Sequence, residues 1–251
     1  GADLTLSGST SGVEAGQTVT VTFGGKNYTA SVASDGSWSA TVPAADLALL
    51  TDGSASTQAS VSNINGNSAS AVHNYSVDSS VPTIIINTVA SDNIVNASEA
   101  DAGVTVSGST TAEAGQIVTI TLNSPTVQTY QATVQADGSC SINIPAADLE
   151  ALTDGSHTLT ATVNDKAGNP ASTTHNLAVD LTVPVLTINT IAGDDIINAA
   201  EHGQALVISG SSTGGEAGDV VTVTLNSKTY TTTLDASGNW SVGVPAADVS
   251  A

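Results

Sequence analysis

The sequence predicts an all-β protein made of tandem β-sandwiches, and three observations lead to this fold class. A pattern repeats about every 100 residues, apolar residues alternate with polar ones, and Asp-Gly pairs separate the alternating runs. A repeat of this length is too long for one turn of a solenoid and has the size of a whole domain. Alternation at spacing two is the period of a strand with one buried face, and Asp-Gly is a hairpin signal.

The offset between repeats can be counted directly. Val81-Pro82 recurs at Val183-Pro184, and 184 − 82 = 102. The sequence Pro-Ala-Ala-Asp occurs at 43–46, 145–148 and 245–248. These offsets predict three domains: residues 1–78, which lack an N-terminal strand A, residues 79–180, which are complete, and residues 181–251, which lack the C-terminal strands.

The middle repeat predicts a complete set of strands. The ranges are about 83–89, 104–109, 116–123, 130–136, 139–144, 156–164 and 171–179, with one helical turn near 145–149. Seven short antiparallel strands in about 100 residues are typical of an immunoglobulin-like sandwich. The segments 78–82 and 180–184 join the repeats, and each contains a proline and no glycine. Such linkers are stiff, so we expect an elongated rod.

Charge and cysteine content exclude several kinds of partner. Acidic residues outnumber Lys and Arg by 23 to 3, for a net charge of −20, so we expect no binding to nucleic acid or anionic membranes. No stretch has the roughly 18 apolar residues that membrane insertion needs. Cys140 is the only cysteine, so no disulfide forms within these residues. Divalent cations held by carboxylates are the expected substitute.

The order of motifs in the middle repeat resembles a known family. The motifs are Val-Pro-Thr-Ile-Ile-Ile-Asn-Thr (81–88), Asp-Asn-Ile-Val-Asn-Ala-Ser-Glu (92–99), Ser-Gly-Ser-Thr with Glu-Ala-Gly (107–110, 113–115) and Asp-Lys-Ala-Gly-Asn (165–169). Together they resemble the bacterial Ig-like repeats of giant adhesins secreted by type I systems, the group that includes SiiE and BapA.

The resemblance implies an Ig-like fold, calcium at or near domain junctions and a spacer role. It also implies an extracellular place, at the bacterial surface or secreted, and a part in adhesion, biofilm or virulence. A receptor on the host cell or matrix would then be bound by other parts of the full protein, and the partners of this segment would be calcium ions and neighbouring repeats.

Loop carboxylates are the candidate metal ligands. They crowd into the segment after the first strand and recur one repeat later, and others lie on the linkers and in the loop before the last strand. Oxygen ligands at this density suit Ca²⁺, although the spacing does not match an EF-hand. The alternative is that they are solvated turn residues or helix caps. The candidates are Asp78, Asp92, Asn93, Glu99, Asp165, Asp180, Asp194, Asp195 and Glu201.

Strand alternation predicts which candidates meet. Asp180 on the outgoing linker should approach Asp92 and Glu99, and Asp78 on the incoming linker should approach Asp165. Four other aspartates, Asp35, Asp52, Asp137 and Asp154, each precede a glycine and are interpreted as turn residues.

Two other functions were weighed against the spacer. An enzyme is not expected: the Gly-x-Ser-x-Gly match at 210–214 lacks the strand, sharp turn and helix of a nucleophile elbow. A module that itself binds a glycan or a neighbouring adhesin is the main alternative, but the chain has few aromatic residues. Trp38, Cys140 and Trp240 occupy one equivalent strand position, which predicts a core role.

Overall fold

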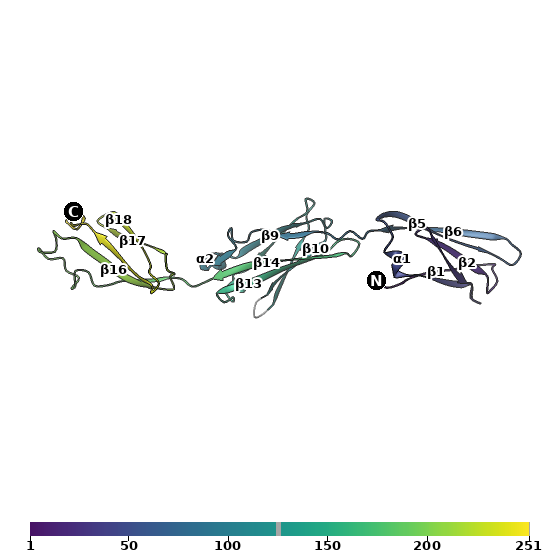
Figure 1. Ribbon diagram of the computed structural model, residues 1–251, viewed down its shortest axis with the longest axis horizontal. Helices are drawn as coiled ribbons and strands as arrows, with labels where there is room; N and C mark the ends of the chain where they lie inside the picture. Colours follow the sequence, from purple (N-terminus) through teal and green to yellow (C-terminus); the bar gives the residue numbers. More distant parts are fainter. Residues whose placement is uncertain (124–126, 251) are drawn as a thin grey trace.

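The structure, a computed structural model, describes residues 1–123 and 127–250. Its strands form three sets that follow one another in chain order (Figure 1), and we call them the N-terminal, middle and C-terminal units. The N-terminal unit comprises β1 (Leu4–Ser9), β2 (Thr18–Phe23), β3 (Lys26–Ser31), β4 (Ser37–Val42), α1 (Ala44–Leu47), β5 (Gly53–Ser62) and β6 (Ser68–Val77). Its two sheets have the strand orders β1-β4 and β3-β2-β5-β6.

The middle unit has the largest core. It comprises β7 (Ile84–Ile86), β8 (Ile94–Asn96), α2 (Ala97–Ala102), β9 (Val104–Thr110), β10 (Ile117–Asn123), β11 (Gln128–Thr133), β12 (Ser139–Ile144), α3 (Ala146–Leu149), β13 (Gly155–Asn164) and β14 (Pro170–Asp180). The orders are β12-β9-β7 in one sheet and β11-β10-β13-β14-β8 in the other. Apolar side chains of both sheets form one buried cluster between them.

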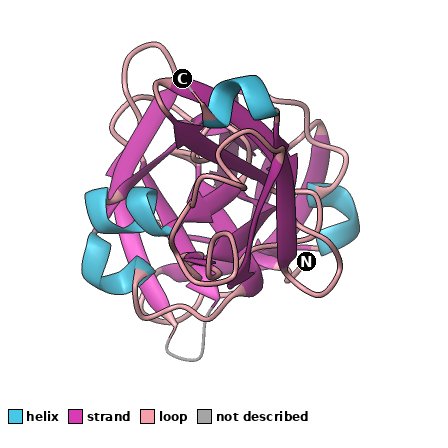
Figure 2. Ribbon diagram, turned by 90° about the vertical axis from the view of Figure 1, so that its left-hand side faces the viewer, coloured by secondary structure: helices cyan, strands magenta, loops and turns pink. Residues whose placement is uncertain are grey.

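The C-terminal unit corresponds to the part of the middle unit from β7 to α3. It comprises β15 (Val185–Ile188), β16 (Leu206–Thr213), β17 (Val220–Leu225), β18 (Lys228–Thr233), β19 (Asn239–Val244) and α4 (Ala246–Val249). Its sheets have the orders β15-β16-β19 and β17-β18. Viewed end-on, the short helices lie at the periphery of the strands (Figure 2).

The all-β sandwich prediction is confirmed, and its clearest element is β10. Val118, Ile120 and Leu122 are buried on one face, whereas Ile117 is exposed. The helical turn expected near 145–149 is α3, and α1 and α4 follow the same Pro-Ala-Ala-Asp sequence in the other units. Within the described residues, no helix has the length and hydropathy needed to cross a membrane.

The segment between β7 and β9 differs from the prediction. We expected one strand over 83–89 and then an open loop, but β7 spans only Ile84–Ile86 and the chain then forms β8 and α2. Val95 of β8 is fully buried, and β8 pairs in parallel with β14. Asn96 caps α2 by accepting from the Glu99 N–H, while the Glu99 carboxylate accepts from the Asn96 N–H. This capping box satisfies two backbone donors and explains why the helix starts there.

Candidate functional site

Each linker is bound to the unit that precedes it by one aspartate. Asp52 Oδ1 accepts from the N–H (2.8 Å) and hydroxyl (2.6 Å) of Ser79, and its Oδ2 accepts from the hydroxyl of Ser80 (2.6 Å). One repeat later, Asp154 accepts from the Leu181 N–H (2.6 Å) and the Thr182 hydroxyl (2.5 Å). We call these two sets of contacts the linker clamps.

The clamps correct the interpretation of Asp52 and Asp154 as turn residues. Each precedes the glycine that begins a long strand, β5 or β13, but its side chain reaches 27 to 28 residues along the chain to the linker. Asp35 and Asp137 fit the prediction, because their carboxylates accept from Ser37 and Ser139, two residues ahead. Asp52 and Asp154 therefore differ from Asp35 and Asp137 in where their hydrogen-bond partners lie. The partners of Asp52 and Asp154 are on the linkers that follow β6 and β14, far away in sequence.

The hydrogen bonds of the linker clamps are predicted to weaken at low pH, when Asp52 and Asp154 become protonated. Hydrogen bonds from Ser79 lower the pKa of Asp52, and the bond from Thr182 lowers that of Asp154. A carboxyl whose pKa is lower in the folded chain stabilises it above its unfolded pKa of about 3.9, and this stabilisation is lost as the pH falls through the folded pKa. We therefore expect NMR titration midpoints of both carboxyl carbons below about 3.9, with the Ser79 and Leu181 amide shifts moving in step.

The control for this titration is Asp52→Asn, which removes the titrating group of the first clamp alone. In this variant the Ser79 amide shift should no longer follow the pH, whereas the Leu181 shift should still do so. Midpoints at or above the ordinary carboxyl value, or a Ser79 shift that still titrates in the variant, would contradict the clamp.

The first linker is also bound to the unit that follows it. The Asn169 side-chain amide donates to the backbone carbonyl of Asp78 (3.2 Å) and to Oδ2 of Asp165 (2.8 Å). Asp165 is buried, and its Oδ1 accepts from the N–H groups of Gly168 (2.8 Å) and Asn169 (2.7 Å). Burial raises the pKa of Asp165, but the hydrogen bonds from Asn169 and Gly168 outweigh it and the net shift is downward. Asp78 and Asp165 thus lie on either side of Asn169.

Glu113 lies at the same end of the middle unit and was not among the predicted residues. Its Oε2 accepts from the Lys166 N–H (2.9 Å), and Glu14 makes the same contact with Ile64 (2.9 Å) in the N-terminal unit. The recurring Glu-Ala-Gly sequence is the signal that could have found this residue. Glu113 ties the loop before β10 to the loop before β14, next to the incoming linker.

At the outgoing end, the candidates make local contacts. Asp180 ends β14 in register with Asn96, and its Oδ1 accepts from the Thr182 N–H (3.1 Å). Asp92 accepts from the N–H two residues ahead (2.9 Å), and Glu99 belongs to the capping box. Asn93 Oδ1 accepts from the Val89 N–H (2.9 Å) and lies 2.7 Å from a ring nitrogen of His175. The structure brings Asp180 to Asn96, and no contact joins it to Asp92 or Glu99 among the described interactions.

The C-terminal unit repeats these local contacts. Asp194 accepts from the Ile196 N–H (3.0 Å), Asp195 from the Ile191 N–H (2.8 Å), and Glu201 from the Asn198 N–H (3.1 Å). The turn and cap alternative therefore describes what one oxygen of each carboxylate does.

The fit to calcium depends on donor type and grouping. In the described part of the chain, no group of three or more His, Cys, Asp or Glu side chains is placed to hold a metal ion. At the first linker, the Asp78 carbonyl and the Asp165 carboxylate lie close together, because the Asn169 Nδ2 donates to both. Carbonyl, carboxylate and amide oxygens are the donors that Ca²⁺ takes. The first linker therefore fits calcium better than the segment from Asp92 to Glu99.

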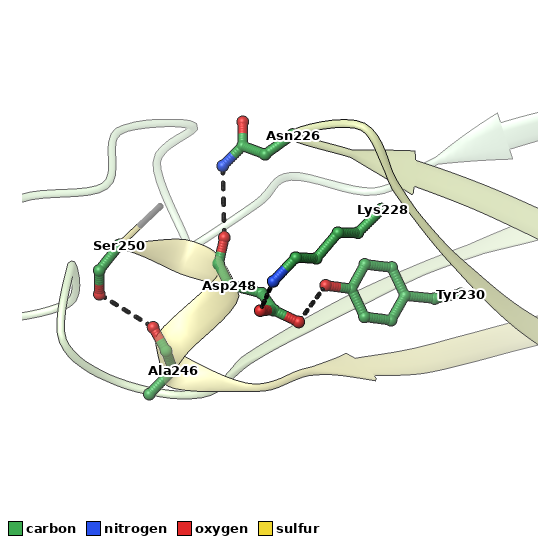
Figure 3. A network of polar contacts seen from close by, with 6 residues as sticks. All are labelled: Asn226, Lys228, Tyr230, Ala246, Asp248 and Ser250. Atoms are coloured by element: carbon green, nitrogen blue, oxygen red, sulfur yellow. Dashed lines mark hydrogen bonds and ion pairs between the residues drawn. The ribbon is translucent and has the colours of Figure 1, made fainter.

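A second polar network recurs inside each unit and anchors the helical turn. In the C-terminal unit, Asp248 of α4 accepts from the Tyr230 hydroxyl (2.7 Å) and is paired with Lys228, as Figure 3 shows. Asp46 makes the same contacts with Tyr28 (2.8 Å) and Lys26 (2.5 Å). In the middle unit, Tyr130 donates to Asp148 (2.6 Å), and burial and this bond raise the pKa of Tyr130. These contacts join the turn to a neighbouring strand and are structural.

The remaining sequence motifs also have structural positions. Strand β16 runs through Ser211 and Ser212, so the Gly-x-Ser-x-Gly match lies on a strand and not on a nucleophile elbow. Cys140 and Trp240 are buried, as predicted for their shared position, while Trp38 is partly exposed.

Sandwich units repeated at a constant offset and joined by clamped linkers define a tandem immunoglobulin-like chain. Comparison with known proteins identifies the family. The family model described as a bacterial Ig-like domain matches residues 82–181. A 1.5-MDa bacterial ice-binding adhesin is 36% identical over 99% of this chain and 82% of its own chain, with a TM-score of 0.45. The chain belongs to the bacterial Ig-like repeats of adhesins.

Two further structures are similar. A Ca²⁺-stabilized adhesin with which an Antarctic bacterium binds ice is 37% identical, covering 99% of this chain and 62% of that one, with a TM-score of 0.48. A bacterial immunoglobulin-like domain from the M. primoryensis ice-binding adhesin is 36% identical over 40% of this chain and 96% of its own, with a TM-score of 0.30. The chain thus spans less than two thirds of the first of these. The comparison with curated proteins gave no match.

Proposed function

We propose that this chain is a spacer segment of a bacterial surface adhesin, in which calcium at the linkers stiffens a rod of sandwich domains. Its place is extracellular, at the cell surface or secreted. The observation that carries the proposal is the linker clamp, which occurs at both junctions with the same geometry. A linker that is held by the preceding domain keeps the next domain at a fixed distance and in a fixed direction, which is what a spacer requires.

Both linkers have further contacts that limit their freedom. Asp78 of the first linker accepts from Asn169 of the next unit. At the second linker, Thr182 lies so close to Gly214 of the C-terminal unit that a Cβ added there would be 2.8 Å from its Cγ2. Each linker also contains a proline, which restricts φ. These contacts and the prolines restrict rotation between neighbouring units.

Charge supports calcium as the stiffening ligand. The net charge of −20 makes a bare rod repel itself, and divalent cations reduce this repulsion where carboxylates face each other. The 37% identical adhesin is described as Ca²⁺-stabilized. Within this proposal, the ligands are sought first at Asp78 and Asp165, then at Asp180, and last among Asp92, Asn93, Glu99, Asp194, Asp195 and Glu201.

The finer parts of the proposal rest on the resemblance of the motifs. They are the domain limits 1–78, 79–180 and 181–251, export by a type I system, and adhesion to a host cell or within a biofilm through other parts of the full protein. The alternative of direct glycan binding has less support, because three of the chain's seven aromatic side chains are already engaged: Phe23 stacks on Tyr75 at 4.9 Å and Trp240 is buried.

Solution scattering tests the rod. A compact domain of 251 residues has a radius of gyration of roughly 18 Å. We expect a value far above this, with an increase in maximum dimension and a loss of flexibility when calcium is added to the metal-stripped chain. A matched titration with magnesium separates specific binding from general screening, since Mg²⁺ prefers to keep its waters. A compact particle with and without calcium would refute the spacer function.

A further inference from the structure

Strand β12 is an edge strand of the middle unit. Its sheet has the order β12-β9-β7, so β9 separates this edge from the first strand of the unit, and among the described strands only β9 pairs with β12. In the other units, β4 and β19 hold the same position, since they pair with β1 and β16, the equivalents of β9. The same edge therefore occurs in all three units.

Proteins usually protect a sheet edge with a short strand, a charged residue or a proline. In the middle unit, β7 and β8 end the two sheets at their opposite edges and have three residues each. Strand β12 has six residues, none of them charged and none of them proline, and β4 and β19 share these properties. The equivalents of β11, the remaining edge, begin with Lys26 and Lys228. We call the unprotected edge formed by β4, β12 or β19 the uncharged edge.

Two residues of β12 point their backbone groups away from the sheet. The Thr110 N–H donates to the Gly138 carbonyl (2.9 Å), and in an antiparallel pair every second residue from there bonds to the same neighbour, here β9. The residues between them face outward. They are Ser139, which is already hydrogen-bonded to the preceding turn, and then Ser141 and Asn143. The residues equivalent to this outward pair are Ser39 and Thr41 on β4, and Ser241 and Gly243 on β19.

The charge of the chain lies away from this edge. Of the 23 acidic residues, only Asp180 lies on a described strand, and the rest are in loops, linkers and short helices. Two copies of a chain of net charge −20 repel each other, but at physiological salt this repulsion is screened beyond about 8 Å. The exposed side chains of Ser141 and Asn143 both donate and accept hydrogen bonds, so two copies of the edge are complementary to each other. A second copy of this chain is therefore the partner that the edge fits.

We propose that the uncharged edge pairs with the same edge of a second copy of this chain, about a two-fold axis. Two-fold pairing places Ser141 opposite Asn143 of the second copy, and about four main-chain hydrogen bonds join the two strands. The paired strands are antiparallel, so the two chains run in opposite directions, as they do when they project from two facing surfaces. The contact uses backbone groups and no calcium ligand, so it stands independently of the proposed spacer function.

Sedimentation equilibrium of the 251-residue chain measures this association, in chelator so that calcium cannot bridge the chains. We expect weak, reversible self-association with a Kd of about 1 mM or below, because a six-residue edge makes an interface at the small end of the range. Association should increase between about 0.02 M and about 0.3 M NaCl, since salt screens the repulsion between the acidic chains.

Two triple variants give a matched comparison, because each adds one negative charge to every unit at an exposed position. The edge variant carries Thr41→Asp, Asn143→Asp and Gly243→Asp, and a Cβ at Gly243 meets no atom within 4 Å. The control variant changes the residues directly opposite these three on the neighbouring strand, with Thr5→Asp, Thr105→Asp and Val207→Asp. The edge variant should associate at least about tenfold more weakly, because pairing would place two aspartates diagonally about 7–8 Å apart. The control should stay within about twofold of the parent chain.

NMR of the unaltered chain at increasing concentration locates the contact, and it keeps the test decisive if a variant fails to fold. The amide shifts of Ser141 and Asn143 should move with concentration, whereas that of Ile120, in the core, should not. The proposal is overturned by a chain that stays monomeric at about 1 mM, by equal association of the two triple variants, or by shifts of Ser141 and Asn143 that do not change with concentration.

Discussion

Replacement of Ile120 by alanine is expected to lower the free energy of unfolding of the middle unit by about 2–5 kcal/mol, the range for large-to-small changes in a core. Ile120 is 3% exposed and lies in the apolar cluster between the two sheets. Truncation removes three methyl or methylene groups from contact and leaves a cavity that neighbouring strands fill only in part.

Ile117→Ala is the matched control, since it makes the same chemical change three residues away on the same strand. Ile117 is 45% exposed and lies on the opposite face of β10, so we expect a loss below about 1 kcal/mol. Hydrogen exchange of the β10 and β13 amides under denaturant measures both losses within the middle unit. Tryptophan emission follows the outer units, which contain Trp38 and Trp240, and should be unchanged. Equal losses for the two variants would contradict the assigned face.

Asp180→Asn is expected to weaken calcium binding at the second linker by about tenfold, or about 1.4 kcal/mol, if the proposed function is correct. Extracellular calcium modules bind at roughly 10⁻⁴ to 10⁻³ M, and their affinity depends on the number of charged ligands. Asp180 lies on the linker beside Asn96. Calorimetric titration of calcium into the metal-stripped variant measures the change, and scattering should show a looser second junction with folded units.

Asp137→Asn is the control because both aspartates make the same contact with the backbone. Asp137 and Asp180 each accept from the N–H two residues ahead, at 3.0 Å and 3.1 Å, and each variant loses one negative charge. Asn serves a tight turn as well as Asp does, so Asp137→Asn should cost within about 0.5 kcal/mol of stability. Its calcium affinity should be nearly intact. Equal loss of affinity in both variants, or none in Asp180→Asn, would rule out calcium at this linker.

Local chemistry was sufficient to predict most of the strands and the helical turn at 145–149, but not β8 and α2. The side chains of 118–122 alternate because a strand points them to opposite faces, so their pattern specified both the strand and its buried side. The Pro-Ala-Ala-Asp turn was also predicted from local chemistry. Proline is tolerated at the start of a helix, and it has no N–H to donate to a hydrogen bond within one. Glu99 was predicted as a metal ligand, with a helix cap as the alternative, and it lies three residues after Asn96. The same spacing also builds a capping box, and the structure shows that form.

Contacts between distant segments determined the rest. Asp52 and Asp137 both precede Gly-Ser and were interpreted alike as turn residues. Asp52 binds the linker because β5 and β6 return the chain to its side. The pairing of Asn169 with Asp78 spans 91 residues. The sequence by itself determined the elements, the repeat and the charge of this protein. The tertiary structure alone decided which carboxylates hold the linkers, because these contacts depend on side chains and backbones that meet only after the sandwich has closed.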